Sequence, residues 1–551
     1  MALSTRNFCL QKNYNYLFFK NKYFNVLRSQ NSVRYLRGTR FGRELDKTEA
    51  KFRELIKNLK VHSKKSILST LEVPEIIGKS GEQKESQDED TNSTLTKKPI
   101  LSTLEVSERI EKSVKQKESQ DEETSSTLSK SEEEPFSVHD RLAEKITPLR
   151  RFTYPVQLKK KYKKSLMLLR MFGEKLRAAK TPITLGQDRL PCPVELMLPS
   201  PVIEQYRNHD EFSIGTGIDG NPKTVGFYLN SILDDSKTVC VGPEELIIIK
   251  ENHKLFVKDF ETYIRNSPLP ATARHDDGGY WKSLIVKSNE SSNLMGIIII
   301  NSQNLTKDQL EDEKNKLREH FETSGLDYNL KSLYFHTWNG IEKMPYDLLF
   351  GEPYIMEEFD RFKLRISPES YLLANTYAAR IMHDSLKKFC RVYESTTLLD
   401  ISCGTGPISF SFSPHVKKCI GIDSCFQSIS DAKYNAELNK EESVTFIHGN
   451  VEMVLPEIFE DNREDLVAVI NSSRTELNKT TFKFLRKCKH LKKIIFISTK
   501  PDVDIANFER LCRPAGKESY LGKYFVPLLA IPVDMFPQTK QYGLIMMFQR
   551  L

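Results

Sequence analysis

The stretch Leu398–Gly406, which reads LLDISCGTG, decides the fold of the C-terminal part of the chain. Its apolar half predicts a buried β-strand at 397–401, and its two glycines let the following turn approach a ligand closely, where a Cβ atom would clash. A second strand, predicted at 419–422, ends in Asp423, 19 residues beyond Gly404. A carboxylate at that point is placed to accept hydrogen bonds from both hydroxyls of a ribose.

This loop lacks the G-x-G-x-x-G spacing of dinucleotide-binding domains, and no P-loop lysine follows it. Together with the acid at the tip of the second strand, it favours S-adenosylmethionine over a dinucleotide as the cofactor. The alternative is a tight turn between strand and helix, with Asp423 as an ordinary surface carboxylate. On the cofactor interpretation, Gly404, Gly406 and Asp423 are candidate binding residues.

Strands and helices alternate through the rest of this region. A helix is predicted at 428–438, and strands are predicted at 397–401, 419–422, 444–447, 466–471 and 493–499. This alternation predicts an α/β fold with a doubly wound, mostly parallel sheet. Between 212 and 350 the pattern differs, because short β-rich runs separated by turn signals predict a mainly antiparallel α+β domain.

A strongly basic segment precedes that domain. Residues 141–180 carry thirteen Lys and Arg but only two acids, Glu144 and Glu174. Apolar residues recur at helical spacing, which predicts a helix with one apolar face and one basic face. Such a helix suits a phosphate backbone, the alternative being a solvated helical face. The lysines expected to contact RNA are Lys159, Lys160, Lys161, Lys163 and Lys164.

The first 136 residues have a different composition from both domains. Residues 1–43 hold nine Lys and Arg and no Asp or Glu, which is typical of a mitochondrial transit peptide and predicts a location in the matrix. A basic arm that binds RNA or a membrane is the alternative. Residues 44–136 are predicted to be a disordered linker, since 53–135 contain no Phe, Tyr or Trp and carry a tandem duplication with an offset of 33 residues.

Composition sets further limits on the class of protein. The net charge of +8 comes from the first 43 residues, since the remainder carries 73 basic and 74 acidic residues. No run of 18 apolar residues is present, so no membrane span is predicted. The nine cysteines form no CxxC pair, which argues against a disulfide scaffold, a zinc finger or an iron–sulfur cluster, and no metal is expected. We expect a monomer.

Several segments together resemble the RNA uridine-C5-methyltransferases. They are YRNHDEF (206–212), DGNPKTVGFYL (219–229), GGYW (278–281), LLFGEPYIMEE (348–358), LRISPESYLLANT (364–376), LLDISCGTG (398–406) and PVDMFPQT (532–539). The resemblance begins near residue 137 and continues to the C-terminus. It implies a Rossmann-like, S-adenosylmethionine-dependent methyltransferase domain at 351–551, preceded by the basic helix and an α+β RNA-binding domain at 137–350.

The resemblance also implies a mechanism and an RNA partner, either tRNA or rRNA. In that family a cysteine thiolate adds to carbon 6 of uracil, and carbon 5 then takes the methyl group from the cofactor. A glutamate removes the proton at carbon 5, and the cysteine is eliminated. The target uridine must leave its stack to reach the pocket.

The motifs of this family carry over unevenly to the chain. Ser402 sits where the family often has an aromatic or small residue, Asp423 replaces a glutamate, and Leu373 stands where a cofactor-binding glutamine is expected. The fourth strand ends in Asn471-Ser472-Ser473-Arg474, so the family's arginine is kept and its prolines are not. The implied cofactor-binding residues are Ser402, Gly404, Gly406, Asp423 and Asn471. The implied RNA-binding residues include Arg207, Asn208 and Arg474.

The two catalytic positions are altered. Thr499 stands in the nucleophile's place at the end of the fifth strand, and Gly543 stands where the glutamate base is expected. An aliphatic hydroxyl is essentially never ionised at neutral pH, and glycine has no group that takes a proton. Neither Cys488 nor Cys512 is predicted at the tip of a strand, so we do not expect either to replace the nucleophile.

The sequence therefore favours a mitochondrial RNA-binding member of the family that has lost, or nearly lost, its chemistry. Such a pseudoenzyme would bind S-adenosylmethionine weakly or not at all. The alternative is an active methyltransferase that forms 5-methyluridine in mitochondrial tRNA or rRNA by a modified mechanism. The identities of residues 499 and 543 separate the two hypotheses.

Overall fold

The computed structural model describes several stretches of the chain, all within one compact unit that covers residues 127–551. They are 137–186, 188–230, 238–272, 279–302, 305–338, 345–461, 465–472, 477–514 and 522–550. The predicted presequence and linker lie outside these stretches, and so does Arg474. Within them, no helix is both long and apolar enough to cross a membrane.

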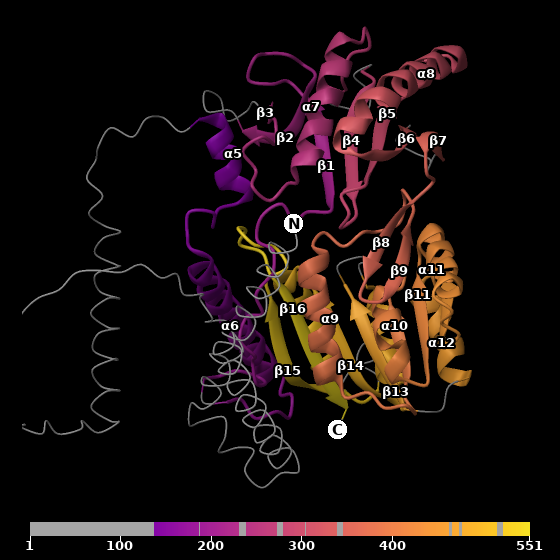
Figure 1. The fold of residues 1–551 in the computed structure, drawn as a ribbon. Coiled ribbons are helices and arrows are strands. Elements are labelled where there is room, and N and C mark those ends of the chain that lie inside the picture. Colours follow the sequence, from indigo (N-terminus) through magenta and orange to yellow (C-terminus); the bar gives the residue numbers. More distant parts are fainter. Residues whose placement is uncertain are drawn as a thin grey trace, which may run out of the picture. The chain divides into compact units, whose positions relative to one another are not determined.

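The C-terminal part of the chain forms a seven-stranded sheet in the order β12-β11-β10-β13-β14-β16-β15 (Figure 1). Its strands are β10 (Thr397–Ile401), β11 (Lys418–Asp423), β12 (Val444–His448), β13 (Leu466–Asn471), β14 (Leu491–Ser498), β15 (Phe525–Val533) and β16 (Gly543–Arg550). Neighbouring strands are parallel, except that β16 runs antiparallel to both β14 and β15. The order reverses beside β10, which confirms the predicted doubly wound, Rossmann-like fold.

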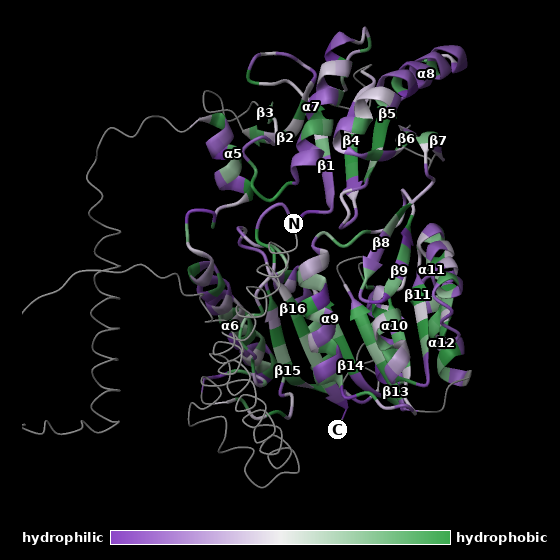
Figure 2. Cartoon of the chain, in the orientation of Figure 1, coloured by the Kyte–Doolittle hydropathy of each residue, from purple (hydrophilic) through white to green (hydrophobic). Residues whose placement is uncertain are grey.

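Both faces of this sheet are covered by helices, which explains why its central strands are continuous apolar runs. Leu398 and Val469 point into one core, whereas Leu399 and Ala468, one residue away along the same strands, point into the other. Figure 2 shows these strands in the colour of apolar residues. The helices of this part are α9 (Thr376–Cys390), α10 (Pro407–Phe412), α11 (Phe426–Leu438), α12 (Val451–Asp461), α13 (Lys479–Lys487) and α14 (Pro501–Cys512).

The basic segment forms helix α6 (Tyr154–Ala178), as its periodicity predicts. The sequence groups this helix with the central domain, whereas its apolar face lies against the C-terminal sheet. Leu169, Phe172 and Leu176 join the core beneath α14, where the rings of Phe172 and Phe508 are 5.7 Å apart. The helix is therefore attached to the half of the molecule that carries the glycine loop.

The central part contains a second seven-stranded sheet, in the order β3-β2-β1-β4-β5-β6-β7. Its strands are β1 (His209–Gly215), β2 (Thr224–Asn230), β3 (Thr238–Val241), β4 (Trp281–Ser288), β5 (Leu294–Asn301), β6 (Leu330–Trp338) and β7 (Tyr346–Gly351). All neighbours are antiparallel except β5 and β6, so the mainly antiparallel α+β prediction is confirmed. The accompanying elements are α5 (Val138–Ile146), α7 (Glu251–Asn266) and α8 (Lys307–Ser324). The hairpin of β8 (Ile355–Phe359) and β9 (Phe362–Ile366) packs with the C-terminal part instead, where Phe359 and Phe362 join the core that contains Leu398.

Candidate functional site

The glycine loop between β10 and α10 adopts the backbone conformation that close approach to a ligand requires. The φ angles of Ser402, Gly404 and Gly406 are +62°, +62° and +91°, all in the left-handed region. A Cβ atom at Gly406 would lie 2.7 Å from Cζ of Phe446, so packing also demands glycine there. Buried Asp400 fixes the start of α10, because its Oδ2 accepts hydrogen bonds from the backbone N–H and the hydroxyl of Ser409.

Asp423 lies at the tip of β11 beside this loop, as the sequence predicts for a ribose-binding carboxylate. Its Oδ2 accepts a hydrogen bond of 2.8 Å from the N–H of Gly404, and its Oδ1 accepts one of 2.9 Å from the N–H of Cys425. These bonds orient the carboxylate, which is only 4% exposed. A carboxylate is a group that can accept hydrogen bonds from both hydroxyls of a ribose.

A small, open pocket adjoins the loop. Cys403 and Thr405 of the loop line it together with Asn471, which ends β13. The segment before α9 supplies apolar side chains, among them Leu373, where the resemblance implies a glutamine. The conformation of the loop and the place of Asp423 suit S-adenosylmethionine, although Leu373 offers no hydrogen bond to it.

Sequence reasoning did not single out Phe426, the first residue of α11. Its side chain is 70% exposed although it is large and apolar, and its ring lies 5.6 Å from that of His448 at the end of β12. An exposed aromatic ring three residues after the ribose-type carboxylate is suited to stack on the base of a nucleoside. The sequence signal that could have identified Phe426 is its position three residues after Asp423. That position suggests a function only once the structure shows that the ring is exposed.

The two altered catalytic positions come together at one end of the C-terminal sheet. In the antiparallel ladder of β14 and β16 the last pair is Ser498 with Leu544, so Thr499 and Gly543 are the next residues on facing strands. Asn471 ends the neighbouring strand β13, where it pairs with Ile497. The tip therefore presents a hydroxyl, an amide and a bare backbone, and neither Thr499 nor Gly543 supplies a thiol or a carboxylate.

The cysteines considered as substitutes lie elsewhere. Cys488 is the C-cap of α13, before β14 begins, and Cys512 ends α14. Both are buried, and burial raises the pKa of each thiol. Each thus behaves as a small apolar side chain. Among the described residues, no group of three or more His, Cys, Asp or Glu could hold a metal ion.

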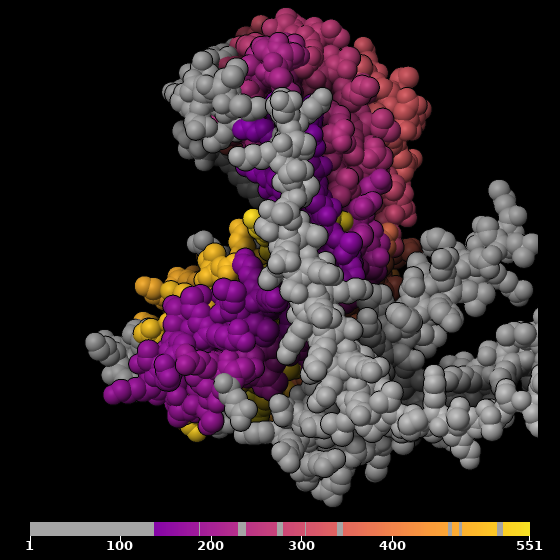
Figure 3. Space-filling view, turned by 90° about the vertical axis from the view of Figure 1, so that its left-hand side faces the viewer, coloured from indigo at the N-terminus to yellow at the C-terminus, as the bar shows by residue number. Residues whose placement is uncertain are grey.

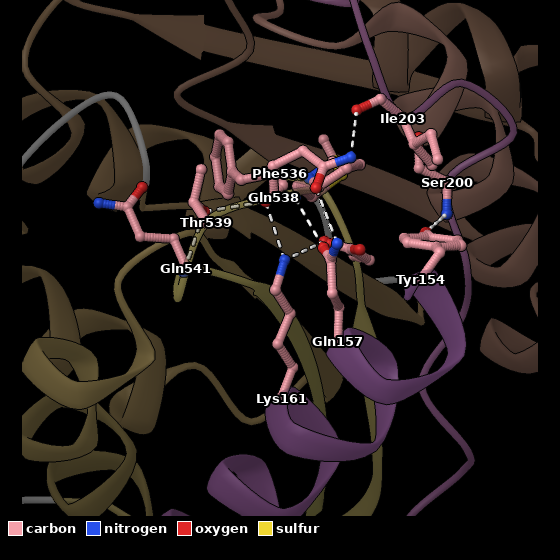
Figure 4. Close-up of polar contacts among 12 residues, drawn as sticks. Tyr154, Gln157, Lys161, Ser200, Ile203, Phe536, Gln538, Thr539 and Gln541 are labelled. Carbon is pink, nitrogen blue, oxygen red and sulfur yellow. Dashed lines mark hydrogen bonds and ion pairs between the residues drawn. The ribbon is translucent and has the colours of Figure 1, made fainter. Parts of the chain in front are cut away.

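The segment that leads to Gly543 is held by α6 (Figure 4). The ammonium of Lys161 lies 2.6 Å from Oδ1 of Asp534 and donates a hydrogen bond of 2.8 Å to the carbonyl of Phe536. Gln157 and Gln538 exchange two hydrogen bonds, of 2.7 and 2.9 Å. Lys161 is only 1% exposed, so it contacts the interior of the protein rather than solvent.

The other residues predicted to bind RNA fall into two groups. Lys159, Lys160, Lys163 and Lys164 are exposed on α6, although Lys164 also pairs with Asp502 at 2.9 Å. Figure 3 shows the part of the chain near residues 150–200 at the molecular surface. Asn208 is buried and donates hydrogen bonds to the carbonyl of Leu373 and the hydroxyl of Thr376. The guanidinium of Arg207 binds Asp210 and the carbonyl of His209.

Comparison with known proteins agrees with this geometry. Residues 393–518 match a family model described as a methyltransferase domain. The crystal structure of the Pyrococcus abyssi tRNA (uracil-54, C5)-methyltransferase with S-adenosyl-L-homocysteine superposes with a TM-score of 0.50 at 18% identity, over 73% of this chain and 84% of that one. The fold and the glycine loop thus define a protein of the S-adenosylmethionine-dependent methyltransferase class.

Curated relatives define the family within that class. The chain is 37% identical to the Danio rerio tRNA (uracil-5-)-methyltransferase homolog B, over 75% of this chain and 88% of the relative. It is 35% identical to the Homo sapiens homolog B, over 75% of this chain and 84% of that one. The chain belongs to the tRNA (uracil-5-)-methyltransferase family, as its motifs imply.

Proposed function

We propose that this protein is an RNA-binding member of its family that works in mitochondria and no longer carries out methyl transfer. The observation that carries the proposal is that Thr499 and Gly543 are the residues next to the last pair of the β14–β16 ladder, at the sheet's tip. The family's reaction needs a thiolate and a carboxylate at these two positions. A threonine acts as a nucleophile only beside a base, and the amide of neighbouring Asn471 does not accept a proton at neutral pH.

RNA is the proposed partner, and either tRNA or rRNA fits the proposal. The relatives are named for action on tRNA. The exposed lysines of α6 form a row of positive charge on the same half of the molecule as the glycine loop, which suits a phosphate backbone. The acid-free, arginine-rich residues 1–43 support a location in the mitochondrial matrix. We further propose that the protein acts as a monomer.

S-adenosylmethionine is the cofactor that the loop and Asp423 suit, and it supplies a methyl group on a sulfonium when it is bound. Gly404 and Gly406 allow the backbone to approach it, and Asp423 would hold its ribose. Leu373 offers no hydrogen bond where the resemblance implies a glutamine. We therefore propose that the cofactor binds, but more weakly than in relatives that keep the glutamine.

The alternative is an active methyltransferase that forms 5-methyluridine by a modified mechanism. One observation favours it: the glycine loop and Asp423 are held in a form suited to the cofactor. A protein that neither bound the cofactor nor transferred its methyl group would not need that geometry.

Removal of the gene separates the two functions. We would purify mitochondrial tRNA and rRNA from cells with and without the gene and measure 5-methyluridine by mass spectrometry. Crosslinking of the tagged protein would report bound RNA in the same cells. The proposal expects unchanged 5-methyluridine and recovery of crosslinked RNA. Loss of 5-methyluridine that is restored by the intact gene, but not by one encoding Asp423→Ala, would establish the alternative. A protein that recovers no RNA would contradict both.

A further inference from the structure

One wall of the cofactor pocket is a short segment, residues 367–375, between β9 and α9. Tyr371, Leu372 and Leu373 of this segment line the pocket. On its C-terminal-domain side, the segment is tied to α11 by Asp431. The carboxylate of Asp431 accepts hydrogen bonds from the N–H and hydroxyl of Ser367 and from the hydroxyl of Ser370, over 2.6 to 2.9 Å.

The same segment is also tied to the central domain. The ammonium of Lys287, on β4, donates hydrogen bonds of 2.6 Å to the carbonyl of Pro368 and 2.7 Å to the carbonyl of Ser370. Asn208, which precedes β1, binds the other end of the segment. Its backbone N–H donates to the carbonyl of Ala374 at 3.0 Å, and its side-chain amide donates to the carbonyl of Leu373 at 3.2 Å.

These contacts are buried, so water does not replace them readily. Lys287 is 3% exposed and Asn208 is 1% exposed. A buried ammonium is costly unless its donors are satisfied, and here two backbone carbonyls of the pocket wall accept its hydrogen bonds. Of the two carbonyls that Lys287 binds, that of Ser370 directly precedes the pocket-lining Tyr371. Asn208 binds the carbonyl of a lining residue itself, so the two residues hold both ends of the wall.

We propose that Lys287 and Asn208 of the central domain are positioning residues for the cofactor pocket. They fix the backbone of 367–375 so that Tyr371, Leu372 and Leu373 form its wall, and they touch no cofactor atom themselves. Cofactor affinity therefore depends on a domain that lies outside the Rossmann-like fold. This inference rests on the proposed retention of S-adenosylmethionine binding.

Lys287→Met tests the proposal, because methionine keeps the length and apolar volume of the stem and removes the donors. Lys331→Met is the matched control, since Lys331 is an exposed lysine on β6 of the same sheet. In the purified full chain, hydrogen exchange would be followed at the amides of 367–375, and binding of S-adenosylhomocysteine would be measured by calorimetry. Lys287→Met should speed exchange in this segment and weaken binding by about fivefold or more, while Lys331→Met changes neither.

Each other outcome contradicts the proposal or its premise. Unchanged exchange at 367–375 in Lys287→Met would show that the lysine does not hold the wall. Faster exchange with unchanged affinity would show that the wall does not set cofactor binding. If Lys287→Met does not fold, Asn208→Ala, which removes one side-chain hydrogen bond to the wall, must give the same pair of effects. Absence of S-adenosylhomocysteine binding by the unaltered protein would instead refute the retained cofactor site.

Discussion

Replacing Lys161 by methionine should destabilise the protein far more than replacing an exposed lysine of the same helix. Lys161 and Asp534 are 1% and 0% exposed, and their charged atoms are 2.6 Å apart. Removing the ammonium leaves the carboxylate buried without its cation, which typically costs about 3–5 kcal/mol. The pair of Lys164 with Asp502 provides a contrast, because these side chains are 46% and 55% exposed and such a pair contributes about 0–1 kcal/mol.

The free energy of unfolding would be measured by urea titration followed by circular dichroism. Lys161→Met should lower it by about 3–5 kcal/mol, while Lys160→Met, on the exposed face, should change it by less than about 0.5 kcal/mol. Replacing both partners, as Lys161→Met with Asp534→Leu, should recover most of the loss, because no buried charge is then left unpaired. Equal effects of Lys161→Met and Lys160→Met would refute the burial and pairing on which the argument rests.

Three further predictions concern acid stability, RNA binding and location. Burial lowers the pKa of His383 to about 3, so the folded state stays neutral where the unfolded state binds a proton. The contribution of neutral His383 to the free energy of unfolding should therefore be complete above about pH 6.5. Below that pH the free energy of unfolding should fall by up to about 1.4 kcal/mol per pH unit. His383→Gln should reduce that dependence, and an identical pH profile would contradict this. Changing the exposed lysines of α6 to glutamine should weaken RNA binding. It should also reduce the slope of log affinity against log salt concentration by about 0.7–0.9 for each phosphate contact that is lost. An unchanged slope would show that α6 faces another partner. The lysines concerned are Lys159, Lys160, Lys163 and Lys164. A reporter protein carrying residues 1–43 should enter mitochondria. Import should be lost when Arg28, Arg34, Arg37 and Arg40 are changed to glutamate. A reporter that stays in the cytosol with the intact segment would refute the presequence.

The parallel part of the C-terminal sheet, from β10 to β14, could be predicted because local sequence dictates it, whereas the antiparallel strands β15 and β16 were not among the predicted strands. Apolar runs that alternate with helices bury both faces of a parallel sheet, and the turn at Gly404 and Gly406 lies where the strand order reverses. The partners of single side chains could not be predicted in this way. That Thr499 and Gly543 lie at the same end of the sheet was expected only from the resemblance to a family, since they are 44 positions apart in the sequence.

The basic helix shows why composition does not separate binding residues from structural ones. Five lysines fall within six positions, and nothing in the sequence distinguishes Lys161 from its neighbours. Its role is set by Asp534, which is 373 residues away in the sequence. Asn208 likewise lies in a polar segment that suggests an RNA contact, yet its amide holds the cofactor pocket's wall. Burial arises from tertiary packing, which no local pattern in one sequence reveals.

The central claim is tested most directly by methyl transfer from labelled S-adenosylmethionine to mitochondrial tRNA and rRNA transcripts, with the purified protein as catalyst. The Danio rerio homolog B would serve as the reference relative in the same assay. We expect no transfer by the unaltered protein and little by Thr499→Cys alone. The double variant Thr499→Cys with Gly543→Glu should restore more methyl transfer than Thr499→Cys alone. Met535→Ala should be added to it, because a Cβ atom at residue 543 would lie 2.8 Å from Cγ of Met535. Robust transfer by the unaltered protein that survives Thr499→Ala would contradict both the loss of chemistry and the position of the active site.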